Sequence, residues 1–141
     1  MPTLFSRIIA GEIPGRFVWR DPDVVAFLTI EPIRPGHVLV VPIAEVDHWV
    51  DLGPDAWARV AEVARLVGLG VRDAMGGARI AQMIAGFEVP HVHVHVYPAD
   101  DLGDLSFAGV DRSPDPAALD EAADRIRAAL RARGHGAHVP D

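Results

Sequence analysis

The sequence predicts a single α+β domain in which helices pack on an antiparallel β-sheet. Two β-rich runs joined by a short turn indicate a hairpin, and two later segments have the three-to-four-residue apolar spacing of amphipathic helices. Hydrophobic residues make up 50% of the 141 residues, which is enough for one buried core. We therefore expect one domain over residues 1–141.

The first elements follow from capping and turn chemistry. Thr3 is a suitable N-cap for a short helix, which Gly11 and a following proline would end. Strands are expected at 17–19 and 24–28, because both runs are rich in β-branched and aromatic residues. The Asp-Pro-Asp sequence between them favours a turn, since proline fixes φ and aspartate bonds to nearby backbone. The two strands should therefore form the hairpin.

The middle of the chain predicts three strands and one long helix. The run 37–41 is mostly β-branched and predicts a central strand covered on both faces. Pro54 opens a helix whose apolar residues recur every three or four positions, and Gly76 closes it. Further strands are expected at 79–84 and at 91–97.

The C-terminal region is expected to hold a loop and a helix between residues 100 and 134. Residues 100–111 lack apolar periodicity, which favours a loop. Ser113 and Pro114 form a cap and first-turn pair for the final helix. The tail 135–141, including its two histidines, is expected to be frayed.

Composition and charge exclude several classes of function. The formal net charge of -7 at pH 7 is unfavourable for general binding to a nucleic-acid backbone, which requires a basic surface. No run approaches the roughly 18 apolar residues of a membrane span, and Arg7 and Glu12 interrupt any signal-like start. The chain has no cysteine, so disulfides and thiol nucleophiles are excluded. We expect a cytoplasmic protein without nucleic-acid or membrane partners.

Three alternating histidines are the main candidates for chemistry. In a strand, His91, His93 and His95 would project from one face while the intervening valines enter the core. An exposed strand face that happens to use histidine is the plainer alternative. Adjacent imidazoles repel one another when charged, however, so the row gains nothing structurally and favours a functional role.

Two chemistries compete for this histidine row. Two histidines at positions i and i+2 of a strand can bind one zinc ion if another element supplies a third ligand. No acidic residue accompanies the row in the sequence, which disfavours this metal site. Alternatively, one imidazole attacks an electrophilic phosphorus while its neighbours fix its tautomer and contact charged oxygens. Nucleophilic catalysis uses all three residues and is the preferred hypothesis.

The segment 90–98, Pro-His-Val-His-Val-His-Val-Tyr-Pro, resembles the signature of the histidine triad (HIT) family, His-φ-His-φ-His-φ-φ with φ apolar. The resemblance continues in segments 4–14, 24–28 and 35–42, in family order. Together these motifs cover most of residues 3–98, whereas the chain beyond Asp100 has no family-wide motif. The resemblance implies a HIT-like fold, a homodimer and no cofactor.

The resemblance also implies the roles of the histidines. His93 would attack an α-phosphorus and form a transient nucleotidyl-histidine that water later hydrolyses. His95 would contact the phosphate oxygens. His91 and His37 would complete the hydrogen-bonded set that orients the nucleophile. The implied activity is that of a nucleotide phosphoramidase or nucleotidyl hydrolase, with a nucleotide or nucleoside phosphoramidate as substrate.

A nucleotide pocket is implied in the same way. Its purine end would be apolar, and the matching residues could equally be ordinary core residues, since pockets and cores share composition. The ten positions expected to contact nucleotide are Leu4, Phe5, Ile8, Phe27, Leu28, Thr29, Ile30, Gly86, Phe87 and Glu88.

Several positions depart from the family pattern. Thr29 stands where many members have an aspartate for the ribose hydroxyls, and Phe87 and Glu88 replace two polar contacts to phosphate and leaving group. The positions of a Cys-x-x-Cys zinc site found in some members hold Thr3 and Ser6, so no metal is expected. These departures leave an alternative: a catalytically weak HIT-fold module that binds a nucleotide, a phosphorylated metabolite or a protein partner.

Overall fold

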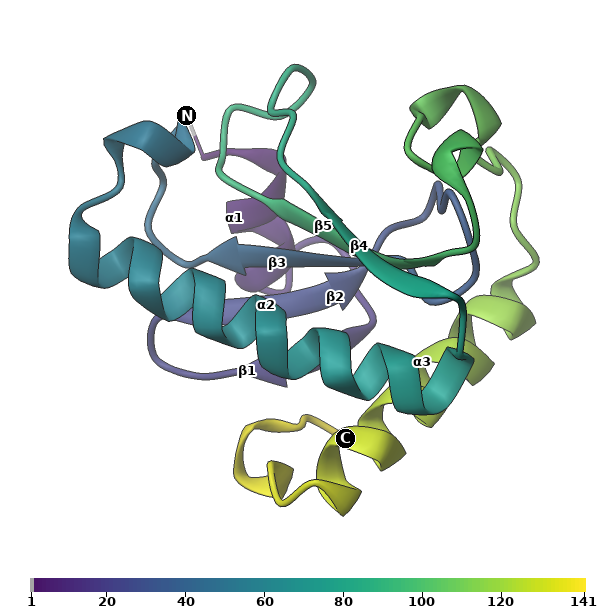
Figure 1. Ribbon diagram of the computed structural model, residues 1–141. Helices are drawn as coiled ribbons and strands as arrows, with labels where there is room; N and C mark the ends of the chain where they lie inside the picture. The colour runs from purple at the N-terminus through teal and green to yellow at the C-terminus, as the bar shows by residue number, and fades with distance from the viewer. Residues whose placement is uncertain (1) are drawn as a thin grey trace.

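The computed structural model describes residues 2–141 and has a five-stranded sheet with helices on both faces (Figure 1). The strands are β1 (Phe17–Arg20), β2 (Val24–Leu28), β3 (Val38–Pro42), β4 (Arg79–Met83) and β5 (Val94–Ala99), in the order β1-β2-β3-β5-β4. Every neighbouring pair is antiparallel. The predicted α+β class is confirmed, and so is the β1–β2 hairpin.

Three α-helices and four short 3-10 helices complete the chain. The α-helices are α1 (Leu4–Ile9), α2 (Pro54–Met75) and α3 (Pro116–Ala132). The 3-10 helices are η1 (Trp49–Asp51), η2 (Leu102–Asp104), η3 (Phe107–Gly109) and η4 (Gly136–His138). Among residues 2–141, no helix combines the length and apolar character needed to cross a membrane.

The sheet separates two apolar layers. Val40 and Val94 are fully buried in the larger layer, which includes α2 and α3. Phe27 and Leu39 lie in the smaller layer with Phe5 of α1. Figure 1 shows α2 in front of the sheet and α1 behind it. Because side chains alternate along a strand, the α1 face remains available for a pocket while the other face supplies most of the core.

The predicted strand over 91–97 is shorter and later than expected, because β5 begins at Val94. The ladder with β3 ends at the pair Val40 and Val94, so continued pairing would join Val41 to His93 and then Pro42 to Val92. Pro42 has no N–H to donate, and its carbonyl oxygen instead accepts a bond from the His91 ring. The first two triad histidines therefore lie on an approach to the strand rather than within it.

The C-terminal helix begins later than Ser113 and Pro114 predicted. Asp115 is the N-cap, its side chain accepts the N–H of Ala117, and Pro116 occupies the first turn. The helix therefore starts with a capping residue followed by proline, as predicted, but two residues later in the chain. Asp115 and Pro116 provide the cap and the first-turn proline in place of Ser113 and Pro114.

The tail is ordered rather than frayed. The rings of His135 and His138 lie 5.5 and 4.9 Å from the ring of Trp19, which is 1% exposed. Val139 is buried against the same core. The tail therefore covers one end of the sheet, a non-local contact that the local sequence does not reveal.

Candidate active site

The register of the sheet brings two triad histidines to the α1 face. Leu39 of β3 pairs with Phe27 on one side and with His95 on the other, so these three residues share a face. His93 and His37 lie two residues before His95 and Leu39 on their own chain segments. Both line the same cavity as those residues. The site is thus built from three neighbouring segments of the sheet.

The ring of His93 is held in one tautomer by the backbone. Its Nδ1 lies 2.7 Å from the carbonyl oxygen of His91, and a carbonyl oxygen only accepts hydrogen bonds. Nδ1 therefore carries the proton, and the neutral ring presents an unprotonated Nε2. The Phe5 ring contacts His93 edge to face, with centroids 4.8 Å apart. The hydrogen bond at Nδ1 and the contact with Phe5 therefore hold the ring in place and leave Nε2 as the nucleophilic nitrogen.

Burial keeps that nitrogen unprotonated. Desolvation lowers the pKa of His93 below its ordinary value. The hydrogen bond to the His91 backbone and the charge of Glu88 act in the opposite direction without reversing the shift, and repulsion from the His91 ring adds to the lowering. The side chain is 7% exposed. A neutral imidazole with an accessible lone pair is the form that nucleophilic attack requires.

A second chain of hydrogen bonds sets the tautomer of His95. The backbone N–H of Ile33 donates to Nδ1 of His37, so His37 holds its proton on Nε2. That nitrogen lies 2.9 Å from Nδ1 of His95 and donates to it. His95 must then carry its own proton on Nε2. The two sets of hydrogen bonds therefore give neighbouring rings opposite tautomers. Nε2 of His93 is an acceptor, and Nε2 of His95 is a donor.

Burial also keeps this second pair neutral. It lowers the pKa of His37 to about 3, with repulsion from His95 adding to the effect. The pKa of His95 falls to about 4, first through burial and then through repulsion from His93. At neutral pH the donor on His95 is therefore a neutral N–H rather than an imidazolium.

His91 does not join the other histidines in the cavity. Its side chain is 0% exposed and bonds to Thr3 and to the carbonyl of Pro42. The His91 ring lies on the α1 side, with its centroid 5.9 Å from that of Phe5, but it does not line the cavity. The reason is the early end of the β3 ladder, which frees the Pro42 carbonyl to bind the ring. His91 reaches the site through its backbone carbonyl, which bonds to His93, and through the contact of its ring with Phe5.

The cavity has a volume of about 730 Å³ and is lined by all ten positions predicted to contact nucleotide. Three of the four predicted catalytic histidines line it as well. The apolar wall near Phe5 and Phe27 is continuous with the smaller core layer, so these residues serve both packing and pocket. Four lining residues are large exposed hydrophobics, namely Leu4, Ile30, Phe87 and Phe107.

The two main departures from the family pattern lie in this cavity. The hydroxyl oxygen of Thr29 accepts the N–H of Glu31, which leaves its proton free to donate. Glu88 is exposed and lines the cavity, and its charge reaches His93. The site therefore offers a neutral donor where the family has a carboxylate, and a carboxylate where the family has a hydroxyl.

Part of the lining was not predicted. The C-terminal segment contributes Phe107, Val110, Arg112 and Asp120. The Phe107 ring contacts His95 edge to face at 5.0 Å. Arg112 pairs with Glu31 at 2.8 Å, and Arg16 pairs with Asp120 at 2.7 Å. Sequence periodicity gives no signal for these contacts, because each joins residues far apart in the chain. The missed residues from earlier segments are Ile13, Pro14, Gly15, Arg16, Glu31, Leu39, Ala85 and Val89.

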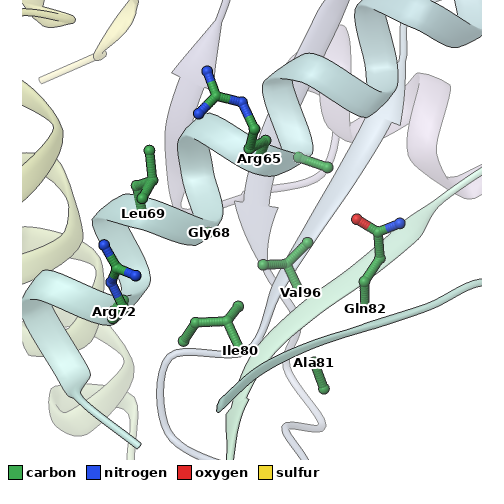
Figure 2. A pocket seen from close by; sticks show the side chains of 9 residues that line it. Arg65, Gly68, Leu69, Arg72, Ile80, Ala81, Gln82 and Val96 are labelled. Carbon is green, nitrogen blue, oxygen red and sulfur yellow. The ribbon is translucent and has the colours of Figure 1, made fainter.

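A smaller cavity of about 260 Å³ lies between α2 and the strands β4 and β5. Figure 2 shows Arg65, Leu69 and Arg72 on the helix, with Ile80 and Val96 on the sheet. Arg65 is paired with Glu62, and no histidine or acidic side chain lines this cavity. It therefore lacks the groups for acid-base or nucleophilic chemistry. Within residues 2–141, no cluster of three or more histidine, cysteine or acidic side chains is placed to hold a metal ion.

Comparison with known proteins supports the resemblance to the HIT family. A family model described as HIT domain matches residues 10–102. An uncharacterised HIT-like protein of Methanocaldococcus jannaschii is 35% identical over 99 residues, covering 67% of this chain and 77% of that protein. The purine nucleoside phosphoramidase of Escherichia coli K12 is 32% identical over 109 residues, covering 73% of this chain and 92% of that enzyme.

Solved structures agree with the sequence relatives. A zinc-bound histidine triad family protein from Mycobacterium smegmatis matches with a TM-score of 0.79 and 27% identity, covering 94% of this chain and 96% of that one. A Hit-like protein from Bartonella henselae matches with a TM-score of 0.77 and 30% identity, covering 90% and 95%. The chain therefore belongs to the histidine triad (HIT) family.

Proposed function

We propose that this protein is a nucleotide-binding hydrolase or transferase that acts as a nucleotide phosphoramidase or nucleotidyl hydrolase through His93. The observation that carries the proposal is the pair of opposite tautomers in one cavity. The unprotonated Nε2 of His93 and the protonated Nε2 of His95 provide an attacking lone pair and a donor for a phosphate oxygen. The named activity of the Escherichia coli relative supports the substrate class.

The proposed reaction has two steps. The Nε2 lone pair of His93 attacks the α-phosphorus, the phosphorus–nitrogen bond of the phosphoramidate breaks, and the leaving amine takes a proton from solvent. Water then attacks the phosphorus, the bond from His93 to phosphorus breaks, and a proton returns to solvent. His93 regains its neutral form because the broken bond leaves its electron pair on Nε2, while Nδ1 keeps its proton and donates to the His91 carbonyl throughout. The Nε2–H of His95 stabilises charge on the phosphate oxygens in both steps.

Turnover of adenosine phosphoramidate tests this proposal. We expect His93→Ala to lose at least about a thousandfold of the rate, as nucleophile removal does in other covalent enzymes. Rapid quenching of the wild type followed by intact-mass measurement should detect a nucleotidyl adduct that the variant lacks. His48→Ala removes an exposed histidine outside the cavity and serves as the control. Wild-type turnover by the His93 variant would contradict the covalent mechanism.

A binding module with weak catalysis is the second candidate, and Glu88 favours it. A carboxylate near the proposed phosphate position repels an anionic substrate. Measuring amine release from the phosphoramidate, beside calorimetry of adenosine monophosphate binding, separates the candidates. An enzyme should turn over the phosphoramidate, whereas a module should bind a phosphorylated ligand and release no amine. Binding without amine release under saturating phosphoramidate would favour the module.

A further inference from the structure

His91 lies outside the cavity, yet both of its ring nitrogens are engaged. Nε2 lies 2.7 Å from the carbonyl oxygen of Pro42, so it must carry the proton. Nδ1 then has only a lone pair, and it lies 2.7 Å from the hydroxyl oxygen of Thr3. The Thr3 hydroxyl therefore donates to His91 rather than to the Ser6 hydroxyl, which lies farther away at 3.2 Å. A fully buried ring is thus fixed at both ends in one tautomer and one orientation.

This ring anchors a piece of backbone that the sheet does not hold. β5 begins only at Val94, and two backbone bonds fix the preceding residues. The N–H of His91 donates to Val89 and the N–H of Val92 donates to Val46, both at 2.8 Å. The His91 carbonyl lies between these two amides and accepts the hydrogen bond from Nδ1–H of His93. The orientation of the His91 residue therefore decides where the nucleophilic ring points.

Thr3 is itself held from several sides. Its hydroxyl oxygen accepts the N–H of Ser6 at 3.1 Å, which makes it the N-cap of α1. Its backbone N–H donates to Glu45 at 2.9 Å. The pKa of Glu45 is lowered, first by its interaction with the Ser6 side chain and then by the bond from the Thr3 N–H. The oxygen of Thr3 is thus directed to α1 and its proton to His91.

We propose that Thr3 is a positioning residue for His93, acting through His91, and that Glu45 fixes Thr3 in place. The proposal rests on the proposed function, because it assumes that His93 is the nucleophile. The same short helix also places the Phe5 ring against His93. One anchor at the start of α1 therefore sets both the wall of the cavity and the direction of the attacking nitrogen.

Loss of the Thr3 hydroxyl has a defined chemical consequence. Nδ1 of His91 would become a buried acceptor without a partner, a state that proteins relieve by moving the ring or changing its protonation. Either change moves the His91 carbonyl and weakens its bond to Nδ1 of His93. His93 can then move its proton to Nε2, and that tautomer has no lone pair directed at the substrate.

Three variants test the proposal in steady-state kinetics. We expect Thr3→Val to lower kcat about 10- to 100-fold, the range that misplacement of a reacting group produces. KM should change less than kcat, because Thr3 itself does not line the cavity. Thr3→Ser keeps the hydroxyl and should restore kcat. Asp115→Ala removes the N-cap of α3 instead, so it controls for lost cap stability without touching His91.

Nitrogen NMR of the histidine rings tests the proposal without any substrate. We expect His93 to hold its proton on Nδ1 in the wild type and in Thr3→Ser, and to populate the Nε2 tautomer in Thr3→Val. An unchanged His93 tautomer in folded Thr3→Val, or a kcat loss no greater than that of Asp115→Ala, would overturn the proposal. A tautomer change in a protein that lacks phosphoramidase activity would uphold the positioning role and reject the proposed function.

Discussion

His37 and His95 differ from ordinary surface histidines because burial removes the water that would stabilise their charged forms. Each ring accepts on Nδ1 and donates on Nε2, and the relay begins at a backbone amide that cannot reverse its direction. The identity of the donor at the cavity floor is therefore set by Ile33, a residue whose side chain does no chemistry. Such a role is invisible in a search for reactive side chains.

The lowered pKa of His37 makes a prediction about stability. A buried histidine that stays neutral in the folded state takes up a proton more readily when unfolded. The free energy of unfolding should therefore decrease as pH falls from 6.5, the ordinary pKa, to about 3, the folded value. Urea titrations across this range measure the effect. His37→Asn should flatten the acid part of the curve, whereas His48→Asn should leave it unchanged. Equal curves for all three proteins would contradict the prediction.

Glu88 makes a second prediction at the residue scale. The exposed carboxylate favours repulsion of the substrate phosphate over proton donation to the leaving group. We expect Glu88→Ser to tighten binding of adenosine monophosphate by on the order of 1 kcal/mol, the scale of a solvated charge pair. The acid limb of the pH-rate profile should move to lower pH, because Glu88 raises the pKa of His93.

Calorimetry and a pH series measure these two effects of Glu88. Asp55→Ser removes another exposed carboxylate outside the cavity and is the matched control. Weaker binding together with loss of the acid-side limb would instead support the general-acid role of Glu88. If neither monophosphate binding nor the acid limb of the pH-rate profile changes, Glu88 is an ordinary surface residue without a role in the site.

At the scale of elements, the sequence predicted those helices, turns and caps that depend on residues a few positions apart. The hairpin, the α2 helix and the cap at Thr3 follow from turn residues, apolar periodicity and capping, which act over a few positions. The assignment of His93 and His95 to one face follows from strand alternation. The departure of His91 could not be predicted, because it depends on the carbonyl of Pro42 in another strand.

The C-terminal segment shows the same limit more strongly. Residues 100–111 have no periodicity, yet η2 and η3 form there around side-chain caps from Asp101 and Ser106. The Tyr97 hydroxyl donates to the carbonyl of Asp104, which ties this segment to β5. These contacts bring Phe107 over His95, and only the folded chain reveals them.

The η3 helix provides a prediction of its own. Phe107→Ala should lower kcat/KM about fivefold, because an edge-to-face aromatic contact contributes roughly 1 kcal/mol. Added water at His95 should also raise the pKa of that residue toward its ordinary value, since burial is the main cause of its low value. Kinetics across pH measure both changes. Leu105→Ala removes an exposed side chain of the same segment that does not line the cavity. Equal effects of the two variants would contradict a specific role for Phe107.

At the scale of the whole molecule, β4 forms one of the two edges of the sheet. Among the described residues, β4 pairs only with β5, and the groove between β4 and α2 lies beside that edge (Figure 2). An open strand edge is a ready site for pairing with another chain. The family resemblance implies a homodimer, and this edge with its neighbouring groove is where we expect a second copy to bind.

Light scattering after size exclusion tests this expectation. We expect twice the monomer mass for the wild type and the monomer mass for Leu69→Lys, because a charge in the groove of Figure 2 opposes burial. Leu102→Lys changes an exposed leucine on the C-terminal segment and should leave the dimer intact. A monomeric wild type at micromolar concentration would contradict the expected assembly.

The cavity is lined by residues both inside and outside the segment that matches the family domain. The histidine floor lies within residues 10–102, which match the family domain, whereas Phe107, Val110 and Arg112 lie beyond it. Substitutions in the outer wall can therefore alter which group fits beside the phosphorus without disturbing the tautomers on which attack depends. Under the proposed function, we expect grafting this segment from a relative to change substrate preference while the hydrogen bonds that set the tautomers of His93 and His95 remain.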